Sequence, residues 1–492
     1  MDVLEKLEEL EKGAECLEPG PEEREALMKK AMQSAEHFLV GLQSLDSKVF
    51  TKASGKSTSD ILNDPLTDEG SSFDDILELF ENGVLKSGVE TAHAMHLGFV
   101  PGGGLFPSAI GDFLTAVTNK YAGVFYVGPE VVRLESKLIA WTASLFGYPS
   151  NHAGNLASGG TASTLIALAT ARDSMNIKGR DYERTVVYLT EMTHNCLRKA
   201  MKVLGMTDAI IREVPIKEET MEMDVGKLKE IIEADIQKDL KPFLVAASVG
   251  NGLTGTVDPI DEIADVTEEY KLWFHVDAAY GGFFVLVDDF KHLFKGIDRS
   301  DSIILDPHKG LFLPYGSGML LVRDGKKLFE ANSLLSTTNI LQDAGVSDRD
   351  TSPCDLSFEL TKHSRGLRMW LPLKLFGVKA FATALEEKLV LAKYFHWRIS
   401  SIDGFVAKPY PQLSIVVFYY DTKDDEITDK FNRELQSMIL EDGRLFISAV
   451  TVGGKYHLRI CVLNFRTHRK HIDLCLQIIE ENTNVLKAKF DV

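Results

Sequence analysis

The chain has 492 residues, 45% of them hydrophobic, and carries a formal net charge of −18. This length and composition predict a globular protein of two or three domains, and the negative charge argues against a nucleic acid or an anionic membrane as partner. No apolar run reaches the ~18 residues that cross a bilayer, and the acidic opening "MDVLEKLEELEKGAE" does not resemble a signal peptide, so we expect a cytoplasmic protein.

The first 88 residues are predicted to form helices with narrow apolar stripes. The opening stretch spaces its leucines along one face of a short helix, "EPGPEE" ends that helix, and a second helix follows over about residues 22–45. A polar, turn-rich loop then leads to a third helix that begins at Phe73. Because these helices have few local partners, we expect residues 1–88 to pack against a second subunit in a homodimer.

Residues 89–370 are predicted to form one large α/β domain. Short apolar runs alternate there with helical segments, and the runs are "RTVVYLT", "AIIREVPI", "FLVAASVG", "LWFHVDAA", "SIILD" and "GMLLV". Runs that are apolar at successive positions and separated by helices are typical of parallel strands covered on both faces. The predicted fold class is therefore α/β, with these six runs as parallel strands.

Residues 371–492 are predicted to form a smaller α+β domain. A long helix through "ALEEKLVLAKYFHWRISSI" leads to the strand-like runs "LSIVVFYYD" and "YHLRICVLNF", with helices between and after them. The chain has no internal repeat and no low-complexity tract. Its five cysteines form no C-x-x-C pair, so we expect reduced thiols, no disulfide scaffold and no metal site.

Ligands of α/β sheets gather at the carboxyl ends of the strands, and two features of the sequence lie at such ends. In "NLASGGTASTLIALATAR", Ser158, Gly159, Gly160 and Thr161 open an apolar helix, which suits a phosphate cradle, although a plain helix start fits the run as well. In "TEMTHNCLRKA", His194 directly follows a strand, where a helix cap or a packed side chain is the alternative.

Two further features place opposite charges at neighbouring strand ends. Asp277 ends the run "LWFHVDAAYGG", and burying a lone carboxylate is costly unless a cation meets it. His308 and Lys309 follow the run "SIILD", where a solvated loop lysine is the simplest interpretation. A plain ion pair between Asp277 and Lys309 is another, but neither alternative explains the glycine cradle.

One ligand uses all four features, because pyridoxal phosphate needs a lysine for its Schiff base, an acid at its pyridine nitrogen, a phosphate cup and a flat cover for its ring. With these residues the chain resembles the group II pyridoxal-phosphate-dependent amino acid decarboxylases, from about residue 73 to about residue 490. The resemblance is most specific in "HVDAAYGG" and "DPHK". It implies the aspartate aminotransferase fold, called fold type I, and a homodimeric carboxy-lyase whose small-molecule substrate is an L-amino acid.

The resemblance also implies roles for individual residues. Lys309 would form the Schiff base, Asp277 would pair with the pyridinium, and His194 would stack on the ring. His194 would also orient the departing carboxylate or return a proton to the substrate carbon. The remaining cofactor residues that it implies lie on the other ring face, at the phosphate or beside the lysine, and are Ala279, Gly160, Thr161, Asp306 and His308.

The sequence departs from the family in two places. The family's "GTTxTG" becomes "SVGNGLTGTVDP", with Gly252 in place of a threonine near the cofactor. The family also has a tyrosine on a loop after the lysine that helps to reprotonate the substrate carbon, and this chain has none between Tyr315 and Tyr394. In relatives the loss of that tyrosine accompanies oxidative conversion to aldehydes. Loop 341–356 offers other polar side chains, namely Asp348, Asp350, Cys354 and Asp355.

The segment "HLGFVPGGGLFPSAIGDFLTAVTNKYAGVFYVGPE" aligns with the substrate-lining region of the family. An acidic substrate would need an arginine or paired amides there, and the segment has neither, which favours an aromatic or apolar amino acid. Three activities stay open: a decarboxylase, an aldehyde-forming enzyme, and a pseudoenzyme that keeps the cofactor as a structural ligand. The candidate substrate-binding residues are Phe99, Gly102, Phe106 and Phe125.

Overall fold

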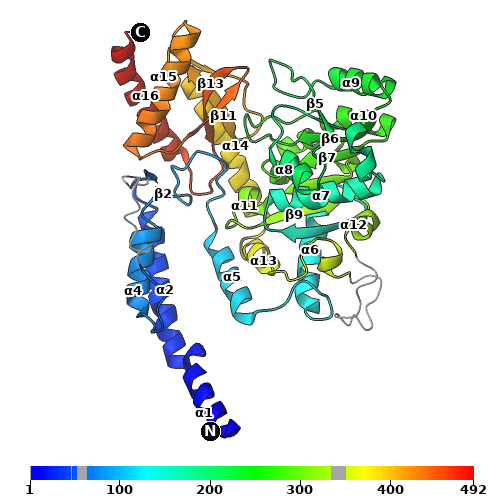
Figure 1. Ribbon diagram of the computed structural model, residues 1–492. Helices are drawn as coiled ribbons and strands as arrows, with labels where there is room; N and C mark the ends of the chain where they lie inside the picture. Colours follow the sequence, from blue (N-terminus) through cyan, green and yellow to red (C-terminus); the bar gives the residue numbers. More distant parts are fainter. Residues whose placement is uncertain (1, 46, 53–63, 334–350, 492) are drawn as a thin grey trace.

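The computed structural model describes residues 2–45, 47–52, 64–333 and 351–491 of the chain. Figure 1 shows three parts: an arm of N-terminal helices, a large sheet covered by helices, and a smaller C-terminal unit of strands and helices, residues 401–491. The predicted boundary between residues 370 and 371 falls within helix α13 (Gly366–Phe376).

The large sheet has seven strands in the spatial order β3-β9-β8-β7-β6-β4-β5. All neighbouring strands from β8 to β5 pair in parallel, while β9 pairs antiparallel with both β8 and β3. The strand bounds are β3 Ala153–Ala157, β4 Thr185–Leu189, β5 Ile210–Glu213, β6 Lys241–Ser248, β7 Trp273–Asp277, β8 Ser302–Leu305 and β9 Gly318–Val322. The fold is thus α/β with a mostly parallel sheet, as expected.

The prediction that "GMLLV" is a parallel strand is wrong. This run is β9, and residues 306–317 connect it to β8 with only one short helix, α11 (Pro307–Gly310). A parallel return usually runs through a full crossover helix, which this connection lacks, and the chain returns here as an antiparallel neighbour. Strand β3 had no predicted counterpart, since its sequence "AGNLA" lacks the β-branched residues typical of strands.

Helices cover both faces of the sheet. Helices α7, α8 and α12 contribute buried residues to the core on one face, and α6, α9 and α10 to the core on the other. The bounds are α5 Phe106–Thr118, α6 Pro129–Leu145, α7 Gly160–Ser174, α8 Cys196–Val203, α9 Val225–Gln237, α10 Ile260–Tyr270 and α12 Gly325–Asn332. Covering both faces explains why the strands of this sheet are apolar at successive positions.

Helix α14 (Val378–Ser400) joins the large sheet to the C-terminal unit. Its first half places Leu385 and Leu389 in the core beside the large sheet, and its second half places Phe395 and Ile399 in the core of the C-terminal unit. That unit has an antiparallel sheet in the order β10-β11-β13-β12. Its elements are β10 Phe405–Ala407, β11 Ile415–Tyr420, α15 Asp425–Asp442, β12 Ser448–Val452, β13 Lys455–Cys461 and α16 Arg469–Phe490.

The N-terminal helices extend away from the rest of the chain in Figure 1 and bury none of their residues. They are α1 (Val3–Ala14), α2 (Pro21–Gly41) and α4 (Phe73–Leu79), and the two-residue strands β1 (Phe50–Thr51) and β2 (Gly88–Val89) pair near their base. Many of their apolar side chains are exposed, including Val3, Leu4, Leu10, Met32 and Val40. In the described part of the chain no helix is long and apolar enough to cross a membrane.

A buried ion pair anchors the segment before α13 to helix α6. Lys362 Nζ lies 3.0 Å from Glu135 Oε2 and 2.6 Å from Asn155 Oδ1, and the side chains of Lys362 and Glu135 are almost fully buried. The other oxygen of Glu135 accepts hydrogen bonds from the backbone N–H groups of Arg365 and Gly366. The pair therefore fixes the path of the chain where it enters α13.

We expect Lys362→Met to lower the free energy of unfolding by about 3–5 kcal/mol, because it leaves the Glu135 carboxylate buried without its cation. Urea denaturation measures the change. The double variant with Glu135→Gln should recover part of the loss, since the amide needs no counter-ion. Lys227→Met, in the exposed pair with Glu230, is the matched control and should leave the unfolding midpoint unchanged. A Lys362→Met midpoint equal to wild type would contradict the anchoring role.

Candidate active site

A cavity of about 860 Å³ lies at the carboxyl ends of the parallel strands. Strand β6 ends at Ser248, β7 ends at Asp277, and Asp306 directly follows β8, so the parallel pairing brings these ends to one edge. Residues of β12 and β13 from the C-terminal unit line part of the cavity. Nine predicted site residues line it, namely Phe99, Gly160, Thr161, His194, Asp277, Ala279, Asp306, His308 and Lys309.

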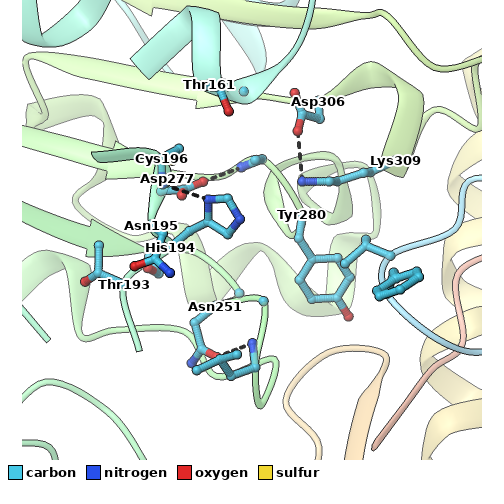
Figure 2. A pocket seen from close by; sticks show the side chains of 18 of the residues that line it. Thr161, Thr193, His194, Asn195, Cys196, Asn251, Asp277, Tyr280, Asp306 and Lys309 are labelled. Atoms are coloured by element: carbon cyan, nitrogen blue, oxygen red, sulfur yellow. Dashed lines mark hydrogen bonds and ion pairs between the residues drawn. The ribbon is translucent and has the colours of Figure 1, made fainter. Parts of the chain in front are cut away.

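Lys309 lies in α11 with its ammonium group in an ion pair. Its Nζ is 2.8 Å from Asp306 Oδ2, and Figure 2 shows this pair beside the side chains of Thr161 and Asp277. Burial acts to lower the pKa of Lys309, but Asp306 and Asp277 outweigh it and raise that pKa. The lysine is therefore an ammonium ion that pairs with the Asp306 carboxylate.

Asp277 is the last residue of β7, and its Oδ1 accepts a hydrogen bond of 3.0 Å from the backbone N–H of Ala279. Burial raises the pKa of Asp277, although Lys309, Ala279 and His194 act in the opposite direction. A carboxylate whose pKa is raised by burial is stabilised by any cation brought against it. The site therefore suits a ligand with a protonated nitrogen.

His194 follows β4 and precedes α8. Its Nδ1 accepts a hydrogen bond of 3.2 Å from the backbone N–H of Cys196, so the ring proton lies on Nε2. Figure 2 shows the imidazole next to Asp277. The hydrogen bond to Cys196 fixes one edge of the ring and leaves Nε2 available to a ligand.

The sequence predicts a phosphate cradle at the start of α7. Ala162 donates the first backbone hydrogen bond of this helix, so the N–H groups of Gly160 and Thr161 precede the intrahelical bonds. A Cβ atom on Gly160 would lie 3.0 Å from Asp306 Oδ2, so only glycine leaves this corner open. Asp306 Oδ1 is buried with no hydrogen-bond partner in the described residues. Free N–H donors and an unpartnered carboxylate oxygen fit a phosphate group that carries a proton.

Comparison with known proteins agrees with this geometry. The sequence profile of the pyridoxal-dependent decarboxylase conserved domain matches residues 56–421, which is more than half of the chain. The chain belongs to the pyridoxal-dependent decarboxylase family. It is a carboxy-lyase, and its cofactor is pyridoxal phosphate, which the residues of the cavity fit.

Relatives of this enzyme include decarboxylases and aldehyde synthases. It is 31% identical to an aromatic-L-amino-acid decarboxylase of Bacillus atrophaeus over 83% of this chain and 86% of that protein. It is 26% identical to a phenylacetaldehyde synthase of Petunia hybrida over 77% of this chain and 78% of that protein. A crystal structure of Oryza sativa TDC with PLP and tryptamine has a TM-score of 0.89 at 23% identity, covering 95% of this chain and 99% of that one. The last comparison shows the fold, which is fold type I.

His308 and Gly102 pack around the segment of the decarboxylase that contains Lys309. His308 Nδ1 lies 2.5 Å from the carbonyl oxygen of Ser317 and donates to it, which leaves Nε2 facing Asp306 at 3.7 Å. Gly102 does not line the cavity but packs so closely on the segment of Lys309 that a Cβ there would lie 2.2 Å from His308 O. The run of three glycines therefore allows close backbone packing.

The structure separates the other candidate substrate residues from this cavity. Phe99 lines it, with its ring 61% exposed, whereas Phe106 and Phe125 are not among its lining residues. Phe106 is exposed on α5, and the Phe125 ring carries the Arg133 guanidinium 5.0 Å from its centroid. In a single subunit, then, only Phe99 of the four candidates reaches the cavity that holds Lys309.

Two residues offered in place of the loop tyrosine also lie away from the cavity. The backbone N–H of Cys354 donates to the carbonyl oxygen of Gly123, and Asp355 Oδ1 accepts a hydrogen bond of 3.0 Å from Ser333 Oγ. Neither residue lines the cavity. The other two, Asp348 and Asp350, lie outside the described residues.

Arg459 is a cavity residue that the sequence did not reveal. It lies on β13, where its guanidinium donates to the carbonyl oxygens of Phe99 and Leu253 at 2.8 and 3.0 Å and to Ser448 Oγ at 2.9 Å. Its Nη2 is buried and has no hydrogen-bond partner in the described residues. The segment around Phe99 indeed has no arginine, but the cavity receives one from the C-terminal unit.

The loop that departs from the family's threonine-rich motif also lines the cavity. Asn251 Oδ1 accepts the backbone N–H groups of Leu253 and Thr254, which shapes the loop in which Gly252 replaces the family's threonine. Gly252 lines the cavity, and a Cβ there would meet no atom within 4 Å.

No disulfide joins the five cysteines. Over the described ranges no group of three or more His, Cys, Asp or Glu side chains could hold a metal ion.

Proposed function

We propose that this enzyme decarboxylates an L-amino acid with an aromatic or apolar side chain, giving the amine and carbon dioxide. The observation that carries the proposal is the single cavity that holds Lys309 with Asp306, the carboxylate of Asp277 and the glycine cradle. Apolar groups from three segments, Phe99, Leu253 and Val450, line the same cavity and suit an apolar substrate side chain. The aromatic-amino-acid decarboxylases among the relatives support the same choice.

We propose roles for the residues around the cofactor. When bound, pyridoxal phosphate supplies an electron sink for the pair of electrons that stays behind as carbon dioxide leaves. Lys309 would hold the cofactor through its aldehyde carbon, and Asp277 would keep the pyridine nitrogen protonated. The N–H groups of Gly160 and Thr161 would bind the phosphate, and His194 and Ala279 would enclose the ring.

A second candidate activity is oxidative conversion of the amino acid to an aldehyde. The observation that favours it is the stretch without tyrosine between Tyr315 and Tyr394, together with aldehyde synthases of Petunia hybrida and Rhodiola rosea among the relatives. In that reaction one amino acid, one dioxygen and one water give one aldehyde, carbon dioxide, ammonia and hydrogen peroxide.

One experiment separates the two activities. Purified enzyme is incubated with a panel of L-amino acids while carbon dioxide, amine, hydrogen peroxide and ammonia are recorded. The proposal expects carbon dioxide and amine in equal amounts from an aromatic or apolar amino acid. Peroxide and ammonia in step with carbon dioxide would establish the aldehyde route instead, and no product from any amino acid would leave a cofactor-binding protein without this activity.

We expect Arg459→Met to raise KM for every substrate about tenfold or more, because it removes a positive charge beside the cavity that would attract the carboxylate shared by all amino acids, and it also removes the hydrogen bonds that position Phe99 and Leu253. Steady-state kinetics on the panel measure the change. If the wild-type enzyme instead prefers acidic amino acids and Arg459→Met abolishes only that preference, then Arg459 recognises a side-chain carboxylate and the aromatic assignment is wrong.

His194→Ala is expected to retain the cofactor and lose at least about a hundredfold in turnover. A stacked imidazole contributes on the order of 1 kcal/mol of contact energy, whereas Lys309 and the phosphate cradle are separate anchors. His194 would orient the departing carboxylate, and a hundredfold loss is the lower end of what such a positioned group supplies. Absorbance of bound cofactor and single-turnover rates measure the two effects. Loss of the cofactor, or near-normal turnover, would make His194 a structural cap.

We also propose that the enzyme acts in the cytoplasm as a homodimer. Residues 1–88 and α5 expose apolar side chains to solvent, and packing against a second copy of the chain would bury them. Phe106 and Phe125, which lie outside the cavity of their own subunit, would then be free to face the cavity of the neighbour. Light scattering at assay concentration that finds an active monomer would contradict the dimer.

A further inference from the structure

Decarboxylation leaves the α-carbon of the substrate in need of a proton, and few groups of the cavity can supply it. The described cavity-lining residues include one cysteine, Cys196, and two tyrosines, Tyr280 and Tyr315, besides His194 and Lys309. Their hydrogen bonds and burial distinguish them, because a proton donor must present its O–H, S–H or N–H group to the substrate.

Cys196 and Tyr280 are both committed elsewhere. The Cys196 sulfur accepts a hydrogen bond from Thr164 Oγ1, and burial raises the pKa of this thiol to about 12. The Tyr280 hydroxyl is buried, lies 2.7 Å from Ser414 Oγ and accepts the backbone N–H of Ser414 at 2.8 Å. Tyr280 therefore fixes the large sheet to the C-terminal unit and does not present its hydroxyl group to the substrate.

Tyr315 has a hydroxyl group without such a commitment. Tyr315 lines the cavity and is 57% exposed, and its ring centroid lies 5.6 Å from that of His308. Its phenol makes no hydrogen bond to any described residue. Arg368 holds the backbone at this point, because its Nη1 donates to Tyr315 O and to Ser317 Oγ, both at 3.1 Å. The same guanidinium binds Asp112 on α5 at 2.6 Å. Arg368 thus fixes the backbone of the segment that contains Tyr315 and that follows Lys309 in the chain.

The charges around Tyr315 suit a general acid. Burial raises the pKa of its phenol, so the group is protonated at neutral pH, while the positive charge of Lys309 acts in the opposite direction. A nearby cation stabilises the phenolate that forms when the proton leaves. A phenol that is protonated at neutral pH can serve as a proton donor, and a positive charge on Lys309 would assist the release of its proton.

We propose that Tyr315 donates the proton that the α-carbon receives after carbon dioxide has left, an inference that rests on the proposed decarboxylase function. The Tyr315 O–H bond breaks, and the proton bonds to the α-carbon through the electron pair left by the broken carbon–carboxylate bond. The phenolate then regains a proton from solvent. Tyr315 in this way takes the task for which loop 341–356 has no tyrosine.

The test compares Tyr315→Phe with wild type on the amino acid that wild type prefers. Amine formation is expected to fall at least about a hundredfold, the lower end of what a general acid supplies. Carbon dioxide release falls less, and in air the difference emerges as aldehyde, ammonia and hydrogen peroxide, because the unprotonated electron pair is open to dioxygen. In wild type, kcat should fall at high pH as the Tyr315 phenol loses its proton, and this fall should be absent in the variant. Tyr410→Phe, at an exposed tyrosine away from the cavity, is the matched control.

Three results would overturn the inference. The first is a Tyr315→Phe enzyme that forms amine and carbon dioxide in the wild-type ratio. The second is a His194→Gln variant that diverts product to aldehyde while Tyr315→Phe does not, which would assign the proton to His194. The third is a wild-type enzyme that releases aldehyde and no amine, since no proton then reaches the α-carbon. A wild type that forms neither product from any amino acid refutes the proposed function itself.

Discussion

Lys309→Ala is expected to abolish the release of carbon dioxide, with a loss of at least about 10⁴-fold, the upper end of the contribution of a single positioned group. No other lysine is among the described residues that line the cavity, so no second amine can take its place. Added methylamine should restore a small part of the activity by supplying the missing amine. Carbon dioxide release measured with and without methylamine checks both statements.

Two variants control for the structural effect of this substitution. Lys309→Arg keeps a cation against Asp306 Oδ2, which lies 2.8 Å from the wild-type Nζ, but the guanidinium is not a nucleophile. It should fold as wild type and be as inactive as the alanine variant. Lys326→Ala, at an exposed side chain of α12, should keep full activity. Turnover of Lys309→Arg within tenfold of wild type would remove Lys309 from its proposed role.

Asp277→Asn is expected to lower turnover about a thousandfold. A carboxylate about 4 Å from a pyridinium contributes roughly 4 kcal/mol at an effective dielectric of 20, which is about three pKa units for the pyridine nitrogen. The amide carries no charge, so the ring loses its proton and with it most of its capacity to accept electrons. Stopped-flow measurement of the first turnover, with the cofactor content of both proteins matched, isolates this effect.

Asp277→Glu is the conservative comparison, because it keeps the negative charge and displaces it by one methylene. It should recover part of the thousandfold loss of the asparagine variant. An asparagine variant within tenfold of wild type would show that Asp277 serves only to cap the turn through its hydrogen bond with Ala279.

The sequence analysis predicted residues that the structure brings to one cavity, because each of them lies at the end of a strand or shortly after it. Asp277 ends β7, Lys309 and His194 lie a few residues after β8 and β4, and Gly160 opens α7 after β3. Parallel strands place their carboxyl ends at one edge, so these residues had to approach one another once the runs formed one sheet. Local pattern and the geometry of α/β sheets were sufficient for this part.

Arg459 shows what the pattern cannot reveal. It lies within β13, where polar and apolar residues alternate, and in such a strand an arginine is expected to face outward into solvent. It reaches the cavity only because the C-terminal unit packs against the large sheet, where Arg459 binds the carbonyl oxygens of Phe99 and Leu253. Strand β9 is a different case, since the short connection after Lys309 already excludes a crossover helix and could have predicted the antiparallel return.

The most direct test of the account asks which residue holds the cofactor. Purified enzyme is reduced with borohydride, which fixes a cofactor bonded to a lysine, then digested and mapped by mass spectrometry. We predict the added cofactor mass on the peptide that contains Lys309 and on no other, with loss of the visible absorbance of the protein. Intact protein without added mass after reduction, or the added mass on another lysine, would contradict the site described for this enzyme.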